Sequence, residues 1–322
     1  MKHYLITGGA GFIGSHLSEQ LLASSDTLIT CIDNFDTFYE DRQKRANLRE
    51  VLDNPRFRLI EEDVTNRAHL LELLDGQTYD AIIHLAAKAG VRNSIEQPEH
   101  YYQVNVMGTL SMLEIARALN IKKFIFASSS SVYGENPNVP WQEIETDLQP
   151  ISPYASSKIS GELLGRTYAH LHGIQFLALR FFTVYGSRQR PDLAIHTFAR
   201  LIYQGKPISL YGDGSTRRDY THVSDIVTGI QQAIEYEGEG FSVFNLASGK
   251  PITLLQLVNA IEKAVGKEAI FVHQPHQPGD VFQTYGDLKR STALLGYRPK
   301  VTLAEGLQEF INWRRKMLQV TH

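Results

Sequence analysis

The sequence predicts an α/β fold: a Rossmann-type doubly wound parallel sheet with a smaller mixed α/β domain at the C-terminal end. Through the first 180 residues, short apolar and β-branched runs alternate with longer segments of helical period. The short runs lack the strict in/out alternation of a half-exposed strand, as expected where helices cover both faces of a sheet. This order of elements builds right-handed βαβ units, and such units make a parallel sheet.

The elements follow one another in strand–helix order from the start of the chain. A strand is predicted at each short run rich in Val, Ile and aromatic residues, because such residues fit a buried strand. These runs cover residues 4–7, 28–33, 57–63, 81–86, 123–129 and 176–182. Helices are predicted where apolar residues recur at helical spacing, over residues 13–24, 41–52, 66–74, 99–119 and 154–172.

After about residue 180 this rhythm changes. Proline residues and glycine turns divide shorter elements, which include predicted helices near 194–204, 222–236, 253–265 and 302–318. We expect one domain over residues 1–180 and a second over residues 181–322. The stretch 223–248 is expected to return to the main sheet.

Composition narrows the class of protein. The 322 residues are 43% hydrophobic and 21% charged, which is ordinary for a globular protein of about two domains. The formal net charge of −3 supplies no positive field for nucleic acid or an anionic membrane. No apolar run reaches membrane-spanning length, and glycines interrupt the first apolar stretch, so we expect neither a membrane helix nor a signal peptide. The single cysteine, Cys31, excludes a disulfide framework and indicates a reducing compartment, so we expect a soluble cytoplasmic protein.

A glycine-rich turn joins the first predicted strand to the first helix. The segment Thr-Gly-Gly-Ala-Gly-Phe-Ile-Gly ends at Gly14, and its spaced glycines let backbone N–H groups and the helix N-terminus approach a pyrophosphate. Asp33 follows at the end of the second strand, where a carboxylate binds the ribose hydroxyls and repels a 2′-phosphate. We therefore expect NAD rather than NADP, bound by Gly8, Gly11, Phe12, Ile13, Gly14, Asp33 and Asn34.

A tyrosine and a lysine stand one helical turn apart in the helix that starts after Pro153. Tyr154 and Lys158 share one helix face, so the lysine ammonium favours the phenolate form of the tyrosine. A free tyrosine has a pKa near 10 and is otherwise a poor base at neutral pH. We expect Tyr154 to remove a proton from a substrate hydroxyl while the adjacent carbon passes hydride to NAD.

The Gly-x-x-Gly-x-x-Gly spacing, together with Tyr-x-x-x-Lys, resembles the extended short-chain dehydrogenase/reductase family. The resemblance implies that Ser129, at the end of the fifth strand, shares the substrate hydrogen bond with Tyr154. It also implies further cofactor contacts after the third and fourth strands and in the helix that follows: Asp63, Val64, Leu85, Ala86, Ala87 and Asn105, besides Tyr154 and Lys158 themselves.

Nucleotide-sugar members of this family begin by oxidising C4 of the sugar and differ in the next step. Their 4,6-dehydratases carry an Asp-Glu pair where this chain has Ser130 and Ser131, and serine has no acid–base capacity near neutral pH. Dehydration is therefore disfavoured. The simplest continuation is rotation of the 4-keto sugar and return of the hydride to its other face, which is 4-epimerisation.

Two segments resemble those of UDP-glucuronate 4-epimerases. The first, Ala-Gly-Val-Arg-Asn-Ser, contains Arg92, and the second, Arg-Phe-Phe-Thr-Val-Tyr-Gly followed by Arg-Gln-Arg-Pro-Asp, contains Thr183 and Arg190. UDP-glucose 4-epimerases usually carry Asn at the position of Thr183. Ser187 replaces a usual proline, which concerns only the stiffness of the loop.

A sugar carboxylate requires several hydrogen-bond donors, and Ser130, Ser131 and Thr183 supply hydroxyls without adding a proton donor. Oxidising C4 of a glucuronate makes a β-keto acid, which readily loses CO2. We therefore hypothesise that a fixed carboxylate suppresses decarboxylation while the ring turns.

The UDP end is assigned to two later segments that resemble nucleotide-sugar motifs. Arg218 lies in Gly-Asp-Gly-x-x-x-Arg-Asp and is expected to bind the diphosphate, and Asp280 lies in a Pro-Gly-Asp loop. Arg190 binds either the ligand or Asp192, and both interpretations stay open at this point. No metal site is expected.

The function implied is NAD-dependent interconversion of UDP-glucuronate and UDP-galacturonate. Three alternatives remain: 4-epimerisation of a neutral UDP-hexose, UDP-glucuronate decarboxylation, and an NAD-sensing protein without catalysis. The helices over 99–119 and 154–172 resemble those that form a four-helix dimer interface in relatives, so a homodimer is expected, with burial of their apolar faces inside the monomer as the competing interpretation.

Overall fold

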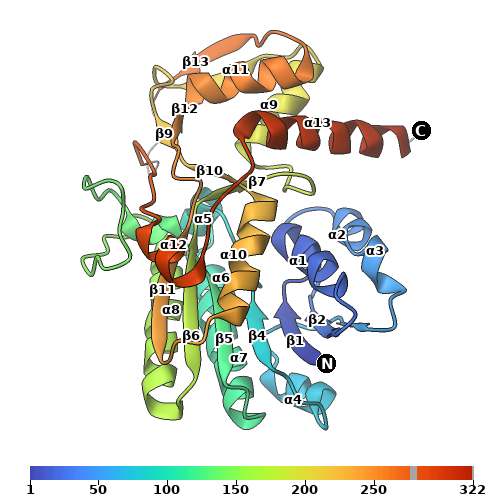
Figure 1. Ribbon diagram of the computed structural model, residues 1–322. Coiled ribbons are helices and arrows are strands. Elements are labelled where there is room, and N and C mark those ends of the chain that lie inside the picture. The colour runs from blue at the N-terminus through green and yellow to red at the C-terminus, as the bar shows by residue number, and fades with distance from the viewer. Residues whose placement is uncertain (276–280, 321–322) are drawn as a thin grey trace.

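A seven-stranded parallel sheet forms the centre of the protein. The computed structural model describes residues 1–275 and 281–320, with side chains as far as residue 317. The strand order is β11-β6-β5-β4-β1-β2-β3 (Figure 1), and every neighbouring pair is parallel. The strands are β1 (Lys2–Thr7), β2 (Thr27–Ile32), β3 (Phe57–Ile60), β4 (Ala81–His84), β5 (Lys123–Ser129), β6 (Gln175–Phe181) and β11 (Phe241–Leu246).

Helices cover both faces of this sheet, which explains why its strands are apolar throughout. In β1, the side chains of Tyr4 and Ile6 enter one core and that of Leu5 enters the other. The first core lies under α1 (Phe12–Leu22), α3 (Arg49–Leu52) and α10 (Val223–Glu235), and the short helix α2 (Asp41–Asn47) precedes α3. The second lies under α4 (Arg67–Leu74), α7 (Gly108–Ala118) and α8 (Pro153–His172). The predicted fold class is therefore confirmed.

One predicted helix is divided in the structure, and another contains a π-helical turn. The predicted helix over 41–52 bends at Leu48, whose side chain is fully buried, while the Asn47 amide donates to the Ala10 carbonyl at 3.1 Å. The predicted helix over 99–119 is one continuous helix, formed by α6 (Pro98–Tyr102), a π-helical turn (Gln103–Met107) and α7. The separate short helix α5 (Val91–Glu96) precedes it. Asn105 in that turn bonds to two segments outside the helix, as described below.

The second part of the chain builds a smaller lobe with its own core. Three two-stranded sheets pair β7 (Thr183–Tyr185) with β10 (Tyr220–His222), β8 (Ile208–Tyr211) with β13 (Phe271–Gln274), and β9 (Arg217–Arg218) with β12 (Ile252–Thr253). The core lies among α9 (Ala194–Tyr203), α11 (Leu254–Val265) and α13 (Leu303–Val320), which lie above the main sheet in Figure 1.

The chain returns to the main sheet between these smaller elements. Helix α10 packs against α1, and β11 then pairs with β6 as the edge strand of the large sheet. Helix α12 (Lys289–Leu295) packs against β11 on the way to α13. Of the helices that the structure describes, none is long and apolar enough to cross a membrane.

Candidate active site

The main cavity, of about 480 Å³, opens at the carboxyl ends of the parallel strands, the edge at which sheets of this kind bind ligands. Its walls come from the glycine-rich turn, the ends of β2, β4 and β5, the start of α8, and the first strand of the smaller lobe. Most of the residues predicted from the sequence line it: Gly8, Gly11, Phe12, Ile13, Gly14, Asp33, Asn34, Asp63, Val64, Leu85, Ala86, Ala87, Ser129, Ser130, Ser131, Tyr154, Lys158, Thr183 and Arg190.

The turn between β1 and α1 admits no side chain at its two critical glycines. Gly8 has a φ of +71°, and a Cβ there would lie 2.7 Å from the backbone nitrogen of Ala86. A Cβ on Gly14 would lie 2.4 Å from the Gly8 carbonyl oxygen. Gly11 precedes α1 and caps it with no side-chain hydrogen bond, so the first N–H groups of the helix face the cavity mouth without a side-chain acceptor. This geometry suits a phosphate group.

Two backbone N–H groups, one from the glycine-rich turn and one from the loop after β2, hold the Asp33 side chain in place. Its carboxylate accepts hydrogen bonds from the Ala10 N–H at 3.0 Å and the Phe35 N–H at 2.9 Å. Burial raises its pKa, and these two N–H groups oppose the rise because they stabilise the charged form. Beside it, the Asn34 amide donates to the Asp63 carboxylate at 2.6 Å. The ends of β2 and β3 therefore present two oriented carboxylates to the cavity.

Tyr154 and Lys158 lie at the start of α8. The Ser152 hydroxyl accepts from the Ala155 N–H at 3.1 Å and Pro153 occupies the first turn, so this helix begins at a fixed place. The Lys158 ammonium donates to the Ala127 carbonyl at 2.7 Å and lies 5.9 Å from the centre of the Tyr154 ring. Burial raises the pKa of Tyr154, whereas the Ser129 hydroxyl and the Arg190 charge oppose that rise. Burial also lowers the pKa of Lys158 to about 7.

Hydroxyl groups gather on the wall next to this pair. β5 ends at Ser129, and the Ser131 hydroxyl donates to the Ser129 oxygen at 2.9 Å. Ser130 and Thr183 line the same cavity, and Thr183 begins β7 of the smaller lobe. This wall thus supplies hydrogen bonds but no carboxylic acid beside Ser129.

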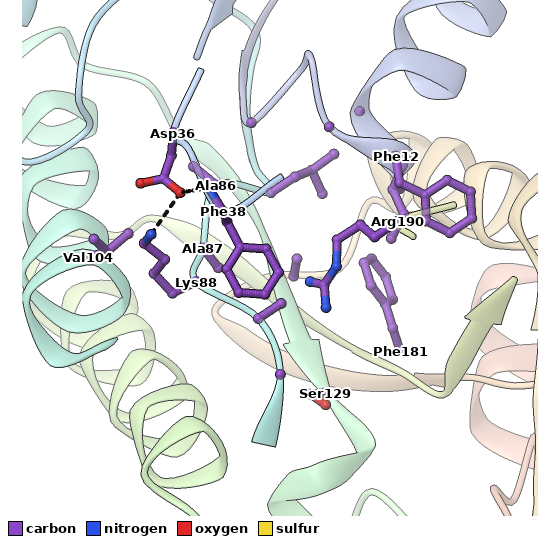
Figure 2. Close-up of a pocket in the computed structure, with 18 of the residues that line it drawn as sticks. Phe12, Asp36, Phe38, Ala86, Ala87, Lys88, Val104, Ser129, Phe181 and Arg190 are labelled. Atoms are coloured by element: carbon purple, nitrogen blue, oxygen red, sulfur yellow. Dashed lines mark hydrogen bonds and ion pairs between the residues drawn. The ribbon is translucent and has the colours of Figure 1, made fainter. Parts of the chain in front are cut away.

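Arg190 reaches into the cavity from the smaller lobe. Figure 2 shows its guanidinium between Phe38 and Phe181, and it lies 4.9 Å from the centre of the Phe38 ring. The same guanidinium makes a two-pronged ion pair with Asp192, at 3.0 and 2.8 Å. Arg190 therefore pairs with Asp192 and lines the cavity at the same time.

Three of the predicted residues do not line the cavity, and a fourth lies outside the described residues. Asn105 lies behind the wall, where its amide donates to the Lys88 carbonyl at 3.0 Å and the Ser157 hydroxyl at 2.9 Å. The Arg92 guanidinium lies 5.7 Å from the centre of the Tyr211 ring. Arg218 donates to the carbonyls of Arg217 and Phe282. Asp280 lies outside the described residues.

Several lining residues were not predicted. The Lys88 ammonium forms an ion pair with the Asp36 carboxylate at 2.7 Å, and Phe38 from the same loop as Asp36 enters the cavity (Figure 2). Lys88 directly follows the predicted Leu-Ala-Ala run, which is the signal that could have found it. Within the part of the chain that the structure describes, no group of three or more His, Cys, Asp or Glu residues could hold a metal ion.

The chain matches known proteins over nearly its full length. The family model described as GDP-mannose 4,6 dehydratase matches residues 5–310. A protein of Methanocaldococcus jannaschii of uncharacterised function is 44% identical, over 97% of this chain and 96% of its own. A UDP-glucuronate 4-epimerase of Thermodesulfobacterium geofontis is 37% identical, over 99% of this chain and 98% of its own.

Among solved structures, a UDP-glucuronic acid 4-epimerase of Bacillus cereus in complex with UDP-glucuronic acid and NAD superposes with a TM-score of 0.89. It is 36% identical, and the match covers 98% of this chain and 99% of the other. The length of the family match and the full-length similarity to these proteins show the family of this chain. The chain belongs to the GDP-mannose 4,6 dehydratase family, within the extended short-chain dehydrogenases/reductases.

Proposed function

We propose that this protein is an NAD-dependent UDP-glucuronate 4-epimerase, which interconverts UDP-glucuronate and UDP-galacturonate. The observation that carries the proposal is the lining of one cavity. It joins the glycine-rich turn and Asp33 to Tyr154 and Lys158, and it places serines where a dehydratase carries acids. The full-length likeness to a UDP-glucuronate 4-epimerase supports the choice of substrate.

The residues of the cavity fit NAD. The turn at Gly8 and Gly14, which leaves no room for a Cβ, would receive the pyrophosphate, and the buried Asp33 carboxylate would receive the ribose hydroxyls. Asp63, Val64, Leu85, Ala86 and Ala87 form the wall beyond the turn. Bound NAD would accept the hydride from C4 of the sugar and later return it. Asn105 would not contact NAD; its side chain would support the cavity wall through hydrogen bonds to the Lys88 backbone.

The proton chemistry belongs to Tyr154. As a phenolate it accepts the proton of the C4 hydroxyl, and as a phenol it returns that proton after the 4-keto sugar has turned over. Lys158 stabilises the phenolate by its charge, and Ser129 shares the hydrogen bond to the sugar oxygen. Because the same hydride returns to the sugar, the cycle causes no net oxidation.

The sugar carboxylate is assigned to the hydroxyl wall of Ser130, Ser131 and Thr183, with Arg190 as the facing cation. Charge-assisted hydrogen bonds of this kind are about twice as strong as neutral ones, so they can fix the orientation of the carboxylate. The UDP end would lie toward the smaller lobe. Arg92, Arg218 and Asp280 remain predictions for that end.

The division into domains follows the same assignment. We propose that residues 1–180, with the returning stretch near 223–248, hold NAD, and that residues 181–322 hold the UDP-sugar. We also propose a homodimer formed by α7 and α8 of each copy as a four-helix bundle. Its support is the exposed apolar side chains along these helices, Leu163 and Leu171 on α8 and Met107 just before α7. A reducing cytoplasm would suit the single buried thiol of Cys31.

The test is to incubate the protein with NAD and UDP-glucuronate, and separately with UDP-glucose, and to follow the sugar protons by NMR. We expect UDP-galacturonate from the first and no product from the second. Tyr154→Phe keeps the ring and removes the acid–base oxygen, so we expect a loss of at least about 100-fold in rate.

Each other outcome identifies a different function. Product from UDP-glucose alone would replace the proposal with a neutral-hexose epimerase, and release of CO2 with a pentose product would replace it with a decarboxylase. NAD binding without any turnover would indicate a sensor protein.

A further inference from the structure

A buried ion pair lies directly behind the Tyr154–Lys158 pair. Glu162 follows Lys158 by four residues on α8, so Tyr154, Lys158 and Glu162 share one face of the helix. Arg180 on β6 grips the Glu162 carboxylate with two hydrogen bonds, from Nε to Oε1 at 3.0 Å and from Nη2 to Oε2 at 2.8 Å. The two side chains are only 3% and 6% exposed.

This ion pair is joined to the strands that end at the cavity. The Ser128 hydroxyl on β5 donates to Glu162 Oε1 at 2.5 Å, and Ser128 is the direct neighbour of Ser129. The Arg180 guanidinium also lies 4.7 Å from the centre of the Tyr133 ring, whose hydroxyl donates to the Asn245 side chain on β11 at 2.8 Å. One carboxylate thus ties α8 to β5 and β6, and through them to β11.

Burying an ion pair has a large desolvation cost in free energy. Removing two charges from water costs several kcal/mol per ion, and a well-packed apolar pair often stabilises a fold as well. The location supplies a reason for it. The pair lies one helical turn from the lysine that is assigned to hold the phenolate, in a region where water does not screen charge.

The charge of Glu162 acts on Lys158 in the direction that the reaction requires. Burial lowers the pKa of Lys158 to about 7, and the Glu162 carboxylate opposes that lowering. Without the carboxylate, the ammonium would lose its proton more readily, and Arg180 would become an unpaired positive charge nearby.

We propose that Glu162, held by Arg180, is a positioning residue that keeps Lys158 protonated and aligned beneath Tyr154. The inference rests on the proposed function, because it assumes that Tyr154 works as the acid–base group. Glu162 itself does not line the cavity.

The other titratable and charged groups that face this stretch are few. His84 on β4 bonds to the hydroxyls of Thr7 and Thr109, and burial lowers its pKa to about 3, so it stays neutral. Burial raises the pKa of Tyr133 well above its usual value, so it stays neutral as well. Arg190 acts on Tyr154 from the cavity, and the buried Tyr101 ring packs edge-on against the Tyr154 ring.

Two substitutions at one position separate charge from shape. Glu162→Gln keeps the shape and removes the charge, whereas Glu162→Asp keeps the charge and shortens the side chain. The pH dependence of kcat/KM for UDP-glucuronate is measured for both and for the unaltered protein. We expect the alkaline limb of Glu162→Gln to move to lower pH by about one unit, the size of shift that a nearby charge produces.

For Glu162→Asp we expect the midpoint of the alkaline limb to stay within about 0.3 of the unaltered value, because one close opposite charge is retained. KM should change less than twofold in both variants, because neither touches the sugar. A purely structural role predicts the reverse order, with the shorter Asp as the more damaging change and no shift of the midpoint in either variant.

A third variant protects the test against misfolding. Glu162→Gln with Arg180→Met leaves no charge in the buried site, and replacement of buried pairs by neutral groups is often tolerated. Its alkaline limb should also fall below that of the unaltered protein. An unchanged midpoint in this variant or in Glu162→Gln overturns the inference. If the unaltered protein does not turn over UDP-glucuronate, the proposed function fails instead.

Discussion

Burial acts against the charged forms of both Tyr154 and Lys158. It raises the pKa of the phenol and lowers that of the amine to about 7, so burial alone favours two neutral groups, whereas the Glu162 carboxylate opposes this effect at Lys158. The phenolate–ammonium state holds the same number of protons and differs only in where one proton lies. The positive charge of a nicotinamide ring beside the phenol would favour the ionised state, and the ligand therefore helps to create the base that the reaction uses.

Asp33 should set the choice between the two nicotinamide cofactors. In Asp33→Asn, the amide no longer repels a 2′-phosphate, so we expect the ratio of NADP to NAD affinity to rise at least about tenfold, which corresponds to about 1.4 kcal/mol. Isothermal titration calorimetry with each cofactor measures this ratio. Asp36→Asn is the control, because Asp36 lines the same cavity but pairs with Lys88, and its ratio should not change. An unchanged ratio in Asp33→Asn would refute the assignment.

The hydroxyl wall should protect the oxidised sugar from losing its carboxylate. Ser131→Ala combined with Thr183→Ala removes two donors from the wall, so we expect CO2 and a 4-keto-pentose product to appear during turnover of UDP-glucuronate. Released CO2 is measured with a sugar labelled at the carboxylate carbon. Adding Tyr154→Phe to the double variant should abolish CO2 release, because no β-keto acid then forms. Undiminished epimerisation without CO2 would reject this role.

Sequence reasoning reached most cavity residues because they lie in motifs with fixed spacing. It missed Asp36, Phe38 and Lys88 because the path of the loop after β2 depends on an unusual backbone conformation. Phe35 has a backbone φ of +49°, a value that residues other than glycine rarely adopt, and its ring is buried. The ion pair between Asp36 and Lys88 joins residues 52 positions apart.

At the scale of elements, α8 lies close to the sheet at two glycines. A Cβ on Gly161 would lie 2.4 Å from the Phe126 ring, and one on Gly165 would lie 2.2 Å from the Phe176 ring. These two glycines let the helix approach β5 and β6, which brings Lys158 within 2.7 Å of the Ala127 carbonyl. The same close packing of α8 on the sheet thus also positions Lys158.

Gly165→Ala should therefore destabilise the protein although alanine favours helices. The helical gain is at most about 1 kcal/mol, whereas overpacking a dense core costs about 1–3 kcal/mol. We expect a lower melting temperature and a lower free energy of unfolding in denaturant titrations. Thr167→Ala, at an exposed position of the same helix, should be neutral or slightly stabilising. A Gly165→Ala variant as stable as the unaltered protein would contradict the close approach.

The order of strands and helices was predictable because both faces of the sheet are covered and the pattern of apolar residues reflects this. The break in the helix over 41–52 and the π-helical turn in the helix over 99–119 were not predictable, because their causes lie elsewhere in the chain. Asn47 bends its helix by bonding to Ala10, 37 residues earlier. Asn105 opens a π-helical turn where it bonds to Lys88 and Ser157. Local periodicity carries no record of such partners.

At the scale of the whole molecule, the two lobes meet through the segment after β7. The Arg188 guanidinium pairs with Glu19 on α1 at 2.6 Å, and the His16 ring bonds to the Ser187 carbonyl at 2.9 Å. The Ser187 hydroxyl also donates to Glu309 on α13 at 3.1 Å. These contacts join residues more than 120 positions apart, so no reading of the local sequence could supply them. They anchor the segment that carries Arg190 to the cavity.

The proposed dimer gives a test at the same scale. Leu163 is 59% exposed on α8, and Leu163→Glu would place a charge in the proposed four-helix interface. We expect light scattering after size-exclusion chromatography to report a dimer for the unaltered protein and a monomer for the variant. Ile270→Glu is the control, because Ile270 is an exposed apolar residue of the smaller lobe outside these helices, and this variant should remain a dimer. A monomeric unaltered protein, or a dimeric Leu163→Glu variant, would contradict this interface.

The pairing of β11 with β6 has a consequence for how the chain matures on the ribosome. The first six strands of the sheet are complete by residue 181, yet their last partner ends at Leu246. Until that stretch emerges from the exit tunnel, the backbone edge of β6 and the surface of α1 that α10 covers stay bare. A nascent polypeptide halted in this interval is therefore the species that chaperones should recognise best, since it offers an unpaired edge and apolar surface together.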